Sequence, residues 1–200
     1  MKKLLLLLLI PVLGCQPNNK PSLNTTQLIE DLRFISSDAT EGRRTGTEGN
    51  RIAREYIITR FQEEGAEPFQ DSYTHEFTFE SRRTQEEMTG INVIAQVEGK
   101  MDSIIVVTAH YDHLGRNDSL IFNGADDDAS GTAALLALAD YFVKNQPNHT
   151  LIFAAFDAEE MGLQGARAFV EDSVLLSKIK LNINMDMISQ NDSSEIYAAG

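Results

Sequence analysis

Cysteine is almost absent from this chain of 200 residues, which contains only Cys15. A single cysteine excludes a disulfide within the chain, and it excludes a cysteine nucleophile anywhere after residue 15. The common nucleophile and nucleotide motifs are also missing, because the sequence has no Gly-x-Ser-x-Gly and no phosphate-binding P-loop. Nothing in the sequence therefore supports catalysis through a covalent serine or cysteine intermediate.

Positive charge is scarce as well. The 17 lysines and arginines face 30 aspartates and glutamates, for a net charge of −13 at pH 7. The two short basic stretches, at 41–44 and 80–83, are each preceded by an acid, and no basic stripe is present. This balance predicts that nucleic acid is not a partner. The acidity by itself mainly indicates a soluble protein.

Hydrophobic runs long enough to cross a bilayer are lacking too. The apolar run Leu4–Leu13 follows two lysines and has ten residues, whereas a membrane-spanning helix needs about 20. It predicts a signal peptide at residues 1–14. The last residues of this region, Val12–Cys15, resemble the bacterial lipobox, in which the cysteine carries lipid and becomes the new N-terminus. An ordinary signal peptide with an incidental cysteine is the alternative.

Residues 15–24 are polar, contain two prolines and are predicted to be a tether behind the lipid. We therefore expect an exported protein that is lipid-anchored to the bacterial cell envelope and that meets the membrane only through Cys15. In bacterial lipoproteins, an aspartate directly after the lipidated cysteine is associated with retention in the inner membrane. Here that position is Gln16, which favours the outer membrane.

The remaining segment, residues 25–200, has the patterns of an α/β protein. Hydrophobic periodicity and capping residues predict helices at 25–36, 47–65, 129–145 and 162–172. Alternating or continuous apolar runs predict strands at 71–80, 91–99, 103–111, 150–160 and 179–189. The alternation of strands and helices after Ser103 predicts a mostly parallel central sheet sandwiched by helices.

Polar side chains lie at the ends of the three strands that are expected to be buried. They are His110, Asp112 and His113 at the end of the first strand, Asp157, Glu159 and Glu160 at the end of the second, and Asp186 at the end of the third. The run Asp126–Asp128 precedes the intervening helix. Because parallel strands end at the same edge of a sheet, these groups should converge there. Imidazole and carboxylate groups at one edge predict a divalent-metal site.

Each of these groups has a simpler explanation when it is taken alone. A histidine can be a hydrogen-bonded core residue, and adjacent glutamates such as Glu159 and Glu160 often begin a solvated helix. The aspartate run also resembles a calcium loop, but its twelfth position is Ala137 rather than an acid. The simple explanations do not account for all four groups at one sheet edge, and the metal site does.

Four motifs, in this order and spacing, closely resemble the secreted di-zinc aminopeptidases of metallopeptidase family 28. They are AHYDHLG, NGADDDASGTAAL, FDAEEMGLQGARAF and NMDMI. The upstream segment 38–69 is similar to the N-terminal segment of that family, so the resemblance covers about residues 30–200. It implies a zinc aminopeptidase fold of the phosphorylase/hydrolase-like type.

The resemblance also implies a role for each motif residue. His110 and Asp186 would bind one zinc ion, Glu160 would bind the other, and Asp127 would bridge the two. Glu159 would be the general base acting on the metal-bound water. Asp112 would hydrogen-bond the far nitrogen of His110 and fix its tautomer. Asp126 and Asp128 would be supporting residues, and the resemblance gives His113 no role.

One family feature is missing, because the second zinc of these enzymes takes a final histidine well downstream and no histidine follows His149 here. We therefore expect residues 25–200 to be the N-terminal part of a zinc peptidase domain, truncated at its C-terminus. A mono-zinc or inactive protein is the alternative. The expected function is an aminopeptidase acting on peptide substrates. The alternatives are a glutaminyl cyclase-like acyltransferase, a carboxypeptidase and a non-catalytic binding relative.

Overall fold

The computed structural model describes residues 22–190 and 197–198. The predicted signal segment and Cys15 lie outside these ranges, so the anchor stays a prediction. None of the helices within them is long and apolar enough to cross a lipid bilayer. The elements are α1 (Thr25–Ile35), η1 (Asp38–Thr40), α2 (Glu48–Glu64), β1 (Glu67–Pro68), β2 (Thr74–Glu80), β3 (Glu87–Val97), β4 (Met101–His110), β5 (Gly115–Asn117), β6 (Leu120–Phe122), η2 (Ala125–Ser130), α3 (Gly131–Lys144), β7 (His149–Phe156), α4 (Gln164–Phe169), α5 (Ser173–Lys178) and β8 (Ile179–Asn184).

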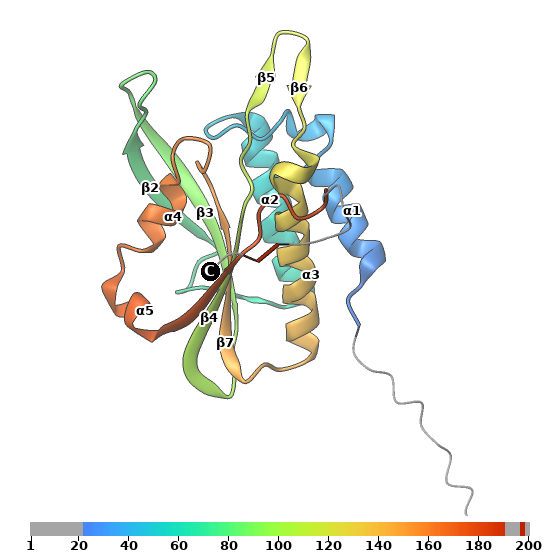
Figure 1. Ribbon diagram of the computed structural model, residues 1–200, viewed down its shortest axis with the longest axis vertical. Helices are drawn as coiled ribbons and strands as arrows, with labels where there is room; N and C mark the ends of the chain where they lie inside the picture. The colour runs from blue at the N-terminus through green and yellow to red at the C-terminus, as the bar shows by residue number, and fades with distance from the viewer. Residues whose placement is uncertain (1–21, 191–196, 199–200) are drawn as a thin grey trace, which may run out of the picture.

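The central sheet has the strand order β1-β3-β7-β4-β8, and β2 pairs with β3 (Figure 1). The predicted α/β class is confirmed. The three strands after Ser103 are parallel, with β4 between β7 and β8. The earlier strands β1, β2 and β3 are added in antiparallel fashion, so the sheet as a whole is mixed. The parallel half is the part that positions the site.

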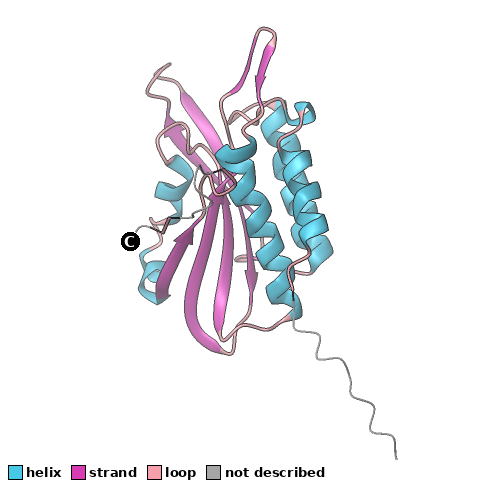
Figure 2. Ribbon diagram, turned by 45° about the vertical axis from the view of Figure 1, so that its right-hand side comes forward, coloured by secondary structure: helices cyan, strands magenta, loops and turns pink. Residues whose placement is uncertain are grey.

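Helices cover both faces of the sheet, as predicted (Figures 1 and 2). On one face α2 and α3 pack on β3, β4 and β7, and α1 packs on α3, around a core that includes Ile57, Phe61, Leu135 and Phe153. On the other face the shorter α4 and α5 cover a smaller core around Ile152. The strands β4 and β7 are therefore buried on both faces, which explains their nearly continuous apolar sequences.

Local sequence signals set the ends of α2. The Thr47 side chain accepts a hydrogen bond from the backbone N–H of Asn50 at the start of the helix, and Gly65 ends it in the left-handed conformation. These two residues are the ends of the helix that was predicted at 47–65. The helix expected at 162–172 is shorter, because α4 covers only Gln164–Phe169 and Gly162 and Leu163 both have positive φ.

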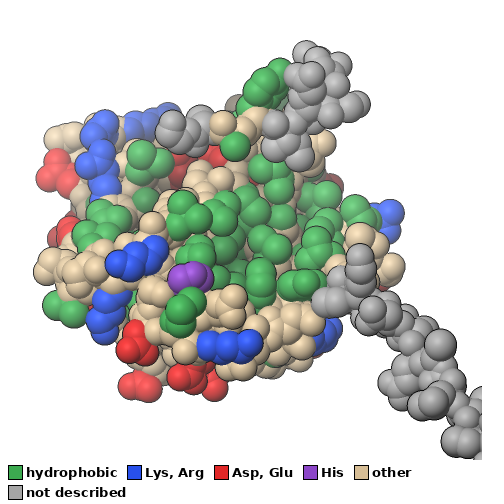
Figure 3. Space-filling model, turned by 60° about the horizontal axis from the view of Figure 1, so that its bottom comes forward, with side chains coloured by type: hydrophobic (Ala, Val, Ile, Leu, Met, Phe, Trp, Pro, Cys, Tyr) green, Lys and Arg blue, Asp and Glu red, His purple; other side chains and the backbone are tan. Residues whose placement is uncertain are grey.

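The strand β8 differs from its prediction as a buried strand. Among the described residues it forms an edge of the sheet, paired only with β4. Leu181 and Ile183 are consequently 51% and 46% exposed. Exposed apolar residues of the neighbouring α5 include Val174 and Leu176, and Figure 3 shows a face on which hydrophobic side chains gather. An apolar strand sequence shows that a strand forms but does not show its place in the sheet.

The short hairpin formed by β5 and β6 was not predicted. It projects from the end of the sheet at which β4 ends (Figure 1). Its strands have three residues each, which is too short for an alternating pattern to be recognised. The hairpin separates the end of β4 from the aspartate turn η2.

Candidate metal centre

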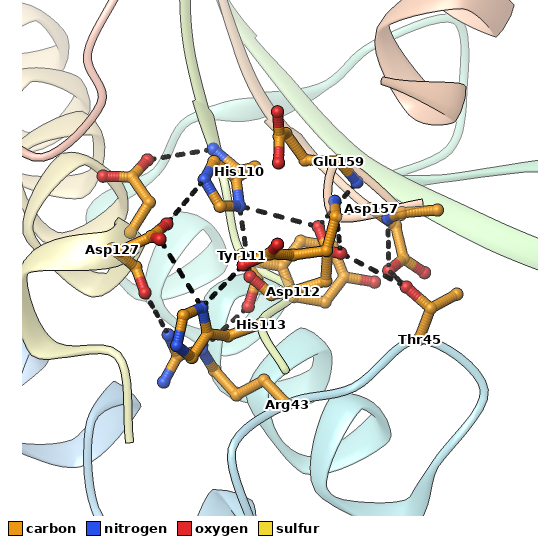
Figure 4. Close-up of polar contacts among 12 residues, drawn as sticks. Arg43, Thr45, His110, Tyr111, Asp112, His113, Asp127, Asp157 and Glu159 are labelled. Carbon is orange, nitrogen blue, oxygen red and sulfur yellow. Dashed lines mark hydrogen bonds and ion pairs between the residues drawn. The ribbon is translucent and has the colours of Figure 1, made fainter. Parts of the chain in front are cut away.

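The predicted convergence of polar residues is present in the structure. The strands β4, β7 and β8 end at one edge of the sheet, and the turn η2 lies beside the end of β4. Figure 4 shows His110, His113 and Asp127 turned toward one another at this edge. Two groups of three potential metal ligands result, and Asp127 belongs to both.

The first group contains His110, Asp127 and Asp186. Nε2 of His110 lies 3.2 Å from Asp127 Oδ1 and 3.9 Å from Asp186 Oδ1. These are the three residues that the resemblance assigns to the first zinc. His110 is 5% exposed, whereas the side chains of Asp127 and Asp186 are 37% and 44% exposed. The imidazole is therefore buried, and the two carboxylates lie on the solvent side of the group.

The second group contains His113, Asp127 and Glu160. Nδ1 of His113 lies 2.8 Å from Glu160 Oε1 and 3.9 Å from Asp127 Oδ2. His113 is 8% exposed, and its buried Nδ1 atom makes no well-aligned hydrogen bond among the described residues, although Glu160 is in contact with it. The structure thus places a buried imidazole nitrogen beside Glu160, which the sequence had left without a nitrogen neighbour.

The supporting aspartates hold the backbone of the site in place. Asp128 is fully buried and accepts hydrogen bonds from the backbone N–H groups of His110, Gly131 and Met187. Asp126 accepts from the backbone N–H groups and hydroxyl of residues 189–190. Their expected supporting position agrees with this geometry. The peptide bond between Asp127 and Asp128 is cis.

Asp112 links two parts of the site. Its carboxylate accepts hydrogen bonds from the backbone N–H groups of Glu159, at 2.9 Å, and Glu160, at 3.3 Å. The far ring nitrogen of His110, Nδ1, lies 3.1 Å from the backbone oxygen of Asp112 and 3.6 Å from its carboxylate. Asp112 therefore orients His110 chiefly through its backbone, while its carboxylate fixes the turn that carries the two glutamates.

Glu159 lines a cavity of about 220 Å³ together with His110 and Asp186. Its side chain therefore faces the first group of ligands rather than the solvent on the outside of the turn (Figure 4). Burial raises the pKa of the Glu159 carboxyl above its usual range, and the negative charges of Asp112, Glu160 and Asp186 raise it further. This is the environment in which a carboxylate becomes a stronger base.

The neighbouring negative charges also shift the pKa values of Glu160 and His110. Burial and neighbouring carboxylates raise the pKa of Glu160. Burial opposes protonation of His110, but Asp112 and other carboxylates outweigh it and raise the pKa of this histidine to about 9. Metal binding requires the neutral imidazole and the ionised carboxylates, so a bound cation would lower the pKa values of these groups.

Two residues have roles that the sequence did not indicate. Arg43 is fully buried and donates hydrogen bonds to the backbone carbonyls of Tyr111, Ile35, Asn123 and Gly124. It thereby ties the chain after β4 to the turn that carries Asp127. Asp157 was grouped with the metal-binding acids, but its side chain turns away from both ligand groups. It accepts from Thr45, Asn50 and the backbone of Ile91.

The donor sets suit zinc. Each group offers one imidazole nitrogen and two carboxylates, with all ligand atoms within 4.8 Å of one another. Imidazole and carboxylate ligands in sets of three are typical of catalytic zinc, which keeps a further position open. In the second group, the buried Nδ1 of His113 faces Glu160 at 2.8 Å without forming a well-aligned hydrogen bond, which is compatible with a cation between them.

Several known proteins share sequence with this chain. The sequence profile described as Peptidase family M28 matches residues 92–200. The vacuolar membrane protease of Schizophyllum commune is 32% identical over 80% of this chain, and the aminopeptidase YwaD of Bacillus subtilis is 29% identical over 74%. This chain covers 18% of the length of the first relative and 32% of the second.

Solved structures share the fold. A glutaminyl cyclase from an Acidobacteriales bacterium superposes with a TM-score of 0.71 and 25% identity, over 87% of this chain and 62% of the cyclase. A zinc-dependent exopeptidase from Parabacteroides distasonis superposes with a TM-score of 0.70 and 18% identity, over 84% of this chain and 63% of the exopeptidase. The chain thus spans less than two thirds of these proteins.

Proposed function

The chain belongs to peptidase family M28, and on that basis we propose that it is part of a zinc-dependent aminopeptidase. The observation that carries this proposal is the pair of ligand groups that share Asp127. A carboxylate common to two groups of ligands suits two metal ions acting together on one substrate. The relative named an aminopeptidase supports the same assignment.

In this proposal His110, Asp127 and Asp186 would hold one zinc ion, and Asp127, Glu160 and His113 would hold the other. Zinc supplies Lewis acidity, which lowers the pKa of water and polarises the carbonyl of the scissile peptide bond. The protein supplies the positions of the ligands. Asp128 and Arg43 fix the backbone around Asp127 and His110, and Asp112 fixes the turn that carries Glu159 and Glu160.

Glu159 is the proposed general base. Its carboxylate takes a proton from the attacking water while the oxygen bonds to the carbonyl carbon. When the carbon–nitrogen bond breaks, Glu159 returns the proton to the leaving amine. Its partial burial and its place in the cavity with His110 and Asp186 support this role. No covalent bond between protein and substrate is required.

A glutaminyl cyclase-like activity is the second candidate, because a glutaminyl cyclase superposes on 87% of this chain. In that reaction the amine of an N-terminal glutamine attacks the carbonyl carbon of its own side-chain amide, the bond to the amide nitrogen breaks and ammonia leaves. A single zinc ion is sufficient. The second group of ligands around His113 and Glu160 favours hydrolysis over cyclisation.

We also propose, from Cys15 and the preceding apolar run, that the protein is anchored to the cell envelope by lipid.

The test uses the natural full-length protein without residues 1–14. Its substrates are leucyl p-nitroanilide, the N-acetylated form of that anilide, a peptide beginning with glutamine, and an N-acetylated dipeptide with a free carboxyl end. We expect hydrolysis of the free-amine anilide only. Glu159→Gln should lower kcat at least about 100-fold, as expected for loss of a general base, with bound zinc unchanged. Glu171→Gln, at an exposed glutamate, is the matched control.

Other outcomes would assign other activities. Cyclisation of the glutamine peptide without hydrolysis of the anilide would establish the second candidate. Hydrolysis of the blocked dipeptide would indicate a carboxypeptidase. If zinc binds and none of these substrates reacts, the proposal of an aminopeptidase is wrong and a non-catalytic role remains.

A further inference from the structure

A second cavity, of about 450 Å³, opens beside the proposed metal centre. Three arginines from two separate segments lie around it: Arg44 precedes α2, and Arg82 and Arg83 belong to the turn between β2 and β3. We call it the arginine pocket, and its complete lining is Arg44, Ser81, Arg82, Arg83, Leu114, Glu160, Met161 and Gly162.

The three arginines are exposed, and their side chains are not paired with other described residues. Among the described residues, their side chains make no hydrogen bond or ion pair, whereas the exposed Arg116 pairs with Glu41 at 2.9 Å. The chain has 30 acids and only 17 lysines and arginines, so an unpaired cluster of this sign is unusual in it. A shared cavity keeps the guanidinium groups available to a ligand.

The position of the pocket relates it to the proposed reaction. Glu160 is part of its lining and is also a member of the second group of ligands. A peptide whose scissile bond lies at the metal centre would therefore extend a neighbouring group into this cavity. Leu114 and Met161 supply an apolar wall for the carbon stem of such a group.

We propose that the arginine pocket binds a carboxylate of the peptide substrate. The inference rests on the proposed peptidase function and adds to it a class of substrate. Guanidinium groups bind carboxylates through two parallel hydrogen bonds, which suits a planar anion at the end of a short stem. The carboxylate belongs to an acidic side chain or to the C-terminus of a short peptide, and the experiment separates these two sources.

The experiment measures kcat/KM for two pairs of substrates with the zinc-loaded full-length protein. Glutamyl and glutaminyl p-nitroanilide differ only in a side-chain carboxylate, and Leu-Leu and its C-terminal amide differ only in a terminal carboxylate. We expect the carboxylate to raise kcat/KM about tenfold or more in one pair, because a hydrogen bond to a charged group contributes about 1.5–3 kcal/mol. The pair that responds identifies the source.

Variants connect the preference to the pocket. In Arg82→Gln/Arg83→Gln the ratio within the responding pair should fall toward one, while the rate with the neutral substrate changes little. Arg82→Lys/Arg83→Lys should retain part of the ratio, because lysine keeps the charge but loses the planar geometry. Arg33→Gln, at an exposed arginine on α1, should behave like the unaltered protein.

A ratio near one in both pairs, in a protein that hydrolyses the neutral substrates, would contradict the proposal that the arginine pocket binds a carboxylate. The proposed peptidase function would not be affected. If no substrate is hydrolysed, the proposed function fails and the pocket is tested by calorimetric titration with N-acetylglutamate and N-acetylglutamine. Binding that is selective for the carboxylate and lost in the double glutamine variant would support the pocket. Equal binding of the two compounds would overturn it.

Discussion

The adjacent residues Arg43 and Arg44 show how far the environments of one residue type differ. Arg43 is fully buried among backbone carbonyls, while Arg44 is exposed at the arginine pocket. Burial lowers the pKa of Arg43 to about 10, although the charges of Asp112, Asp128 and Asp127 oppose this shift. Arg43 is therefore still charged at neutral pH, and its hydrogen bonds are made by a cation.

We predict that Arg43→Met lowers the free energy of unfolding by at least about 3 kcal/mol, because several buried carbonyls lose their donor at about 1–3 kcal/mol each. Urea unfolding measures this loss. Arg44→Met is the matched control, and as an exposed substitution it should change stability by no more than about 0.5 kcal/mol. Similar small losses in both variants would mean that Arg43 does not hold the site together.

His113 is the residue whose role changes most between sequence and structure. We predict that His113→Ala lowers bound zinc from about two ions per chain to one, because the second group would retain only Asp127 and Glu160. Elemental analysis after dialysis measures the zinc content. His149→Ala is the control, because His149 lies at the opposite end of β7 and bonds Ser103. Two retained ions in His113→Ala would show that this imidazole is not a ligand.

At the scale of elements, α1 and α2 share a buried cluster of charges. Arg60 on α2 lies 2.9 Å from Asp31 on α1 and 2.6 Å from Glu64. One oxygen of each of these carboxylates, Asp31 Oδ2 and Glu64 Oε2, is buried without a hydrogen-bond partner among the described residues. Burial, opposed by Arg60, raises the pKa of Glu64 to about 8.

This cluster predicts a pH dependence of stability. Between the ordinary glutamate pKa of 4.5 and the raised value of about 8, the folded state keeps a proton that the unfolded state has released. Stability must then fall as pH rises through this window, by up to about 1.4 kcal/mol per unit. Glu64→Gln should flatten the fall in urea unfolding from pH 5 to pH 8. The control Glu63→Gln changes an exposed partner of Arg60 and should keep the slope. An equally steep fall in Glu64→Gln would contradict the assignment.

Element prediction from the sequence succeeded where local chemistry sets the ends. Thr47 and Gly65 bound α2 because a cap and a left-handed glycine act on neighbouring backbone groups. The prediction of β8 as a buried strand was wrong, since Leu181 and Ile183 are exposed on the edge of the described sheet. Burial of a strand depends on which strands pair with it, and a single strand's sequence does not specify that.

At the scale of the whole molecule, the proposed metal centre joins distant parts of the chain. Its proposed ligands lie at or just after the ends of β4, β7 and β8 and in η2, so they come from four segments that meet only in the folded state. Any ion that binds the folded state and not the unfolded chain stabilises the entire domain. Metal content and global stability should therefore be coupled.

We predict that removing zinc with a chelator lowers the thermal midpoint and that added zinc restores it. At free zinc about 100-fold above the dissociation constant, the stabilisation is about 2.7 kcal/mol. Asp127→Ala should lose most of this shift, because Asp127 belongs to both groups of ligands. Asp102→Asn, at an exposed aspartate near the start of β4, should retain it. Scanning calorimetry measures both, and an unchanged midpoint on chelation would count against a metal centre.

The sequence by itself predicted which ionisable groups meet at the proposed metal centre and at which edge of the sheet they lie. Apolar strands followed by His110, Glu159 and Asp186 place ionisable groups at strand ends, and parallel strands end together. The three adjacent aspartates are chemically alike, and only the resemblance to family 28 singled out Asp127 among them. In the folded turn Asp127 faces the histidines, while Asp126 and Asp128 accept hydrogen bonds from backbone N–H groups.

Tertiary structure alone decided the contacts between residues far apart in the chain. His113 meets Glu160, Arg43 meets the carbonyls near Asp127, and Arg44 shares a cavity with Arg82 and Arg83. None of these pairings has a local signal, because hydrophobic periodicity and caps report only on neighbouring residues. Strand order and side-chain direction bring the partners together, and both are set by packing of the whole domain.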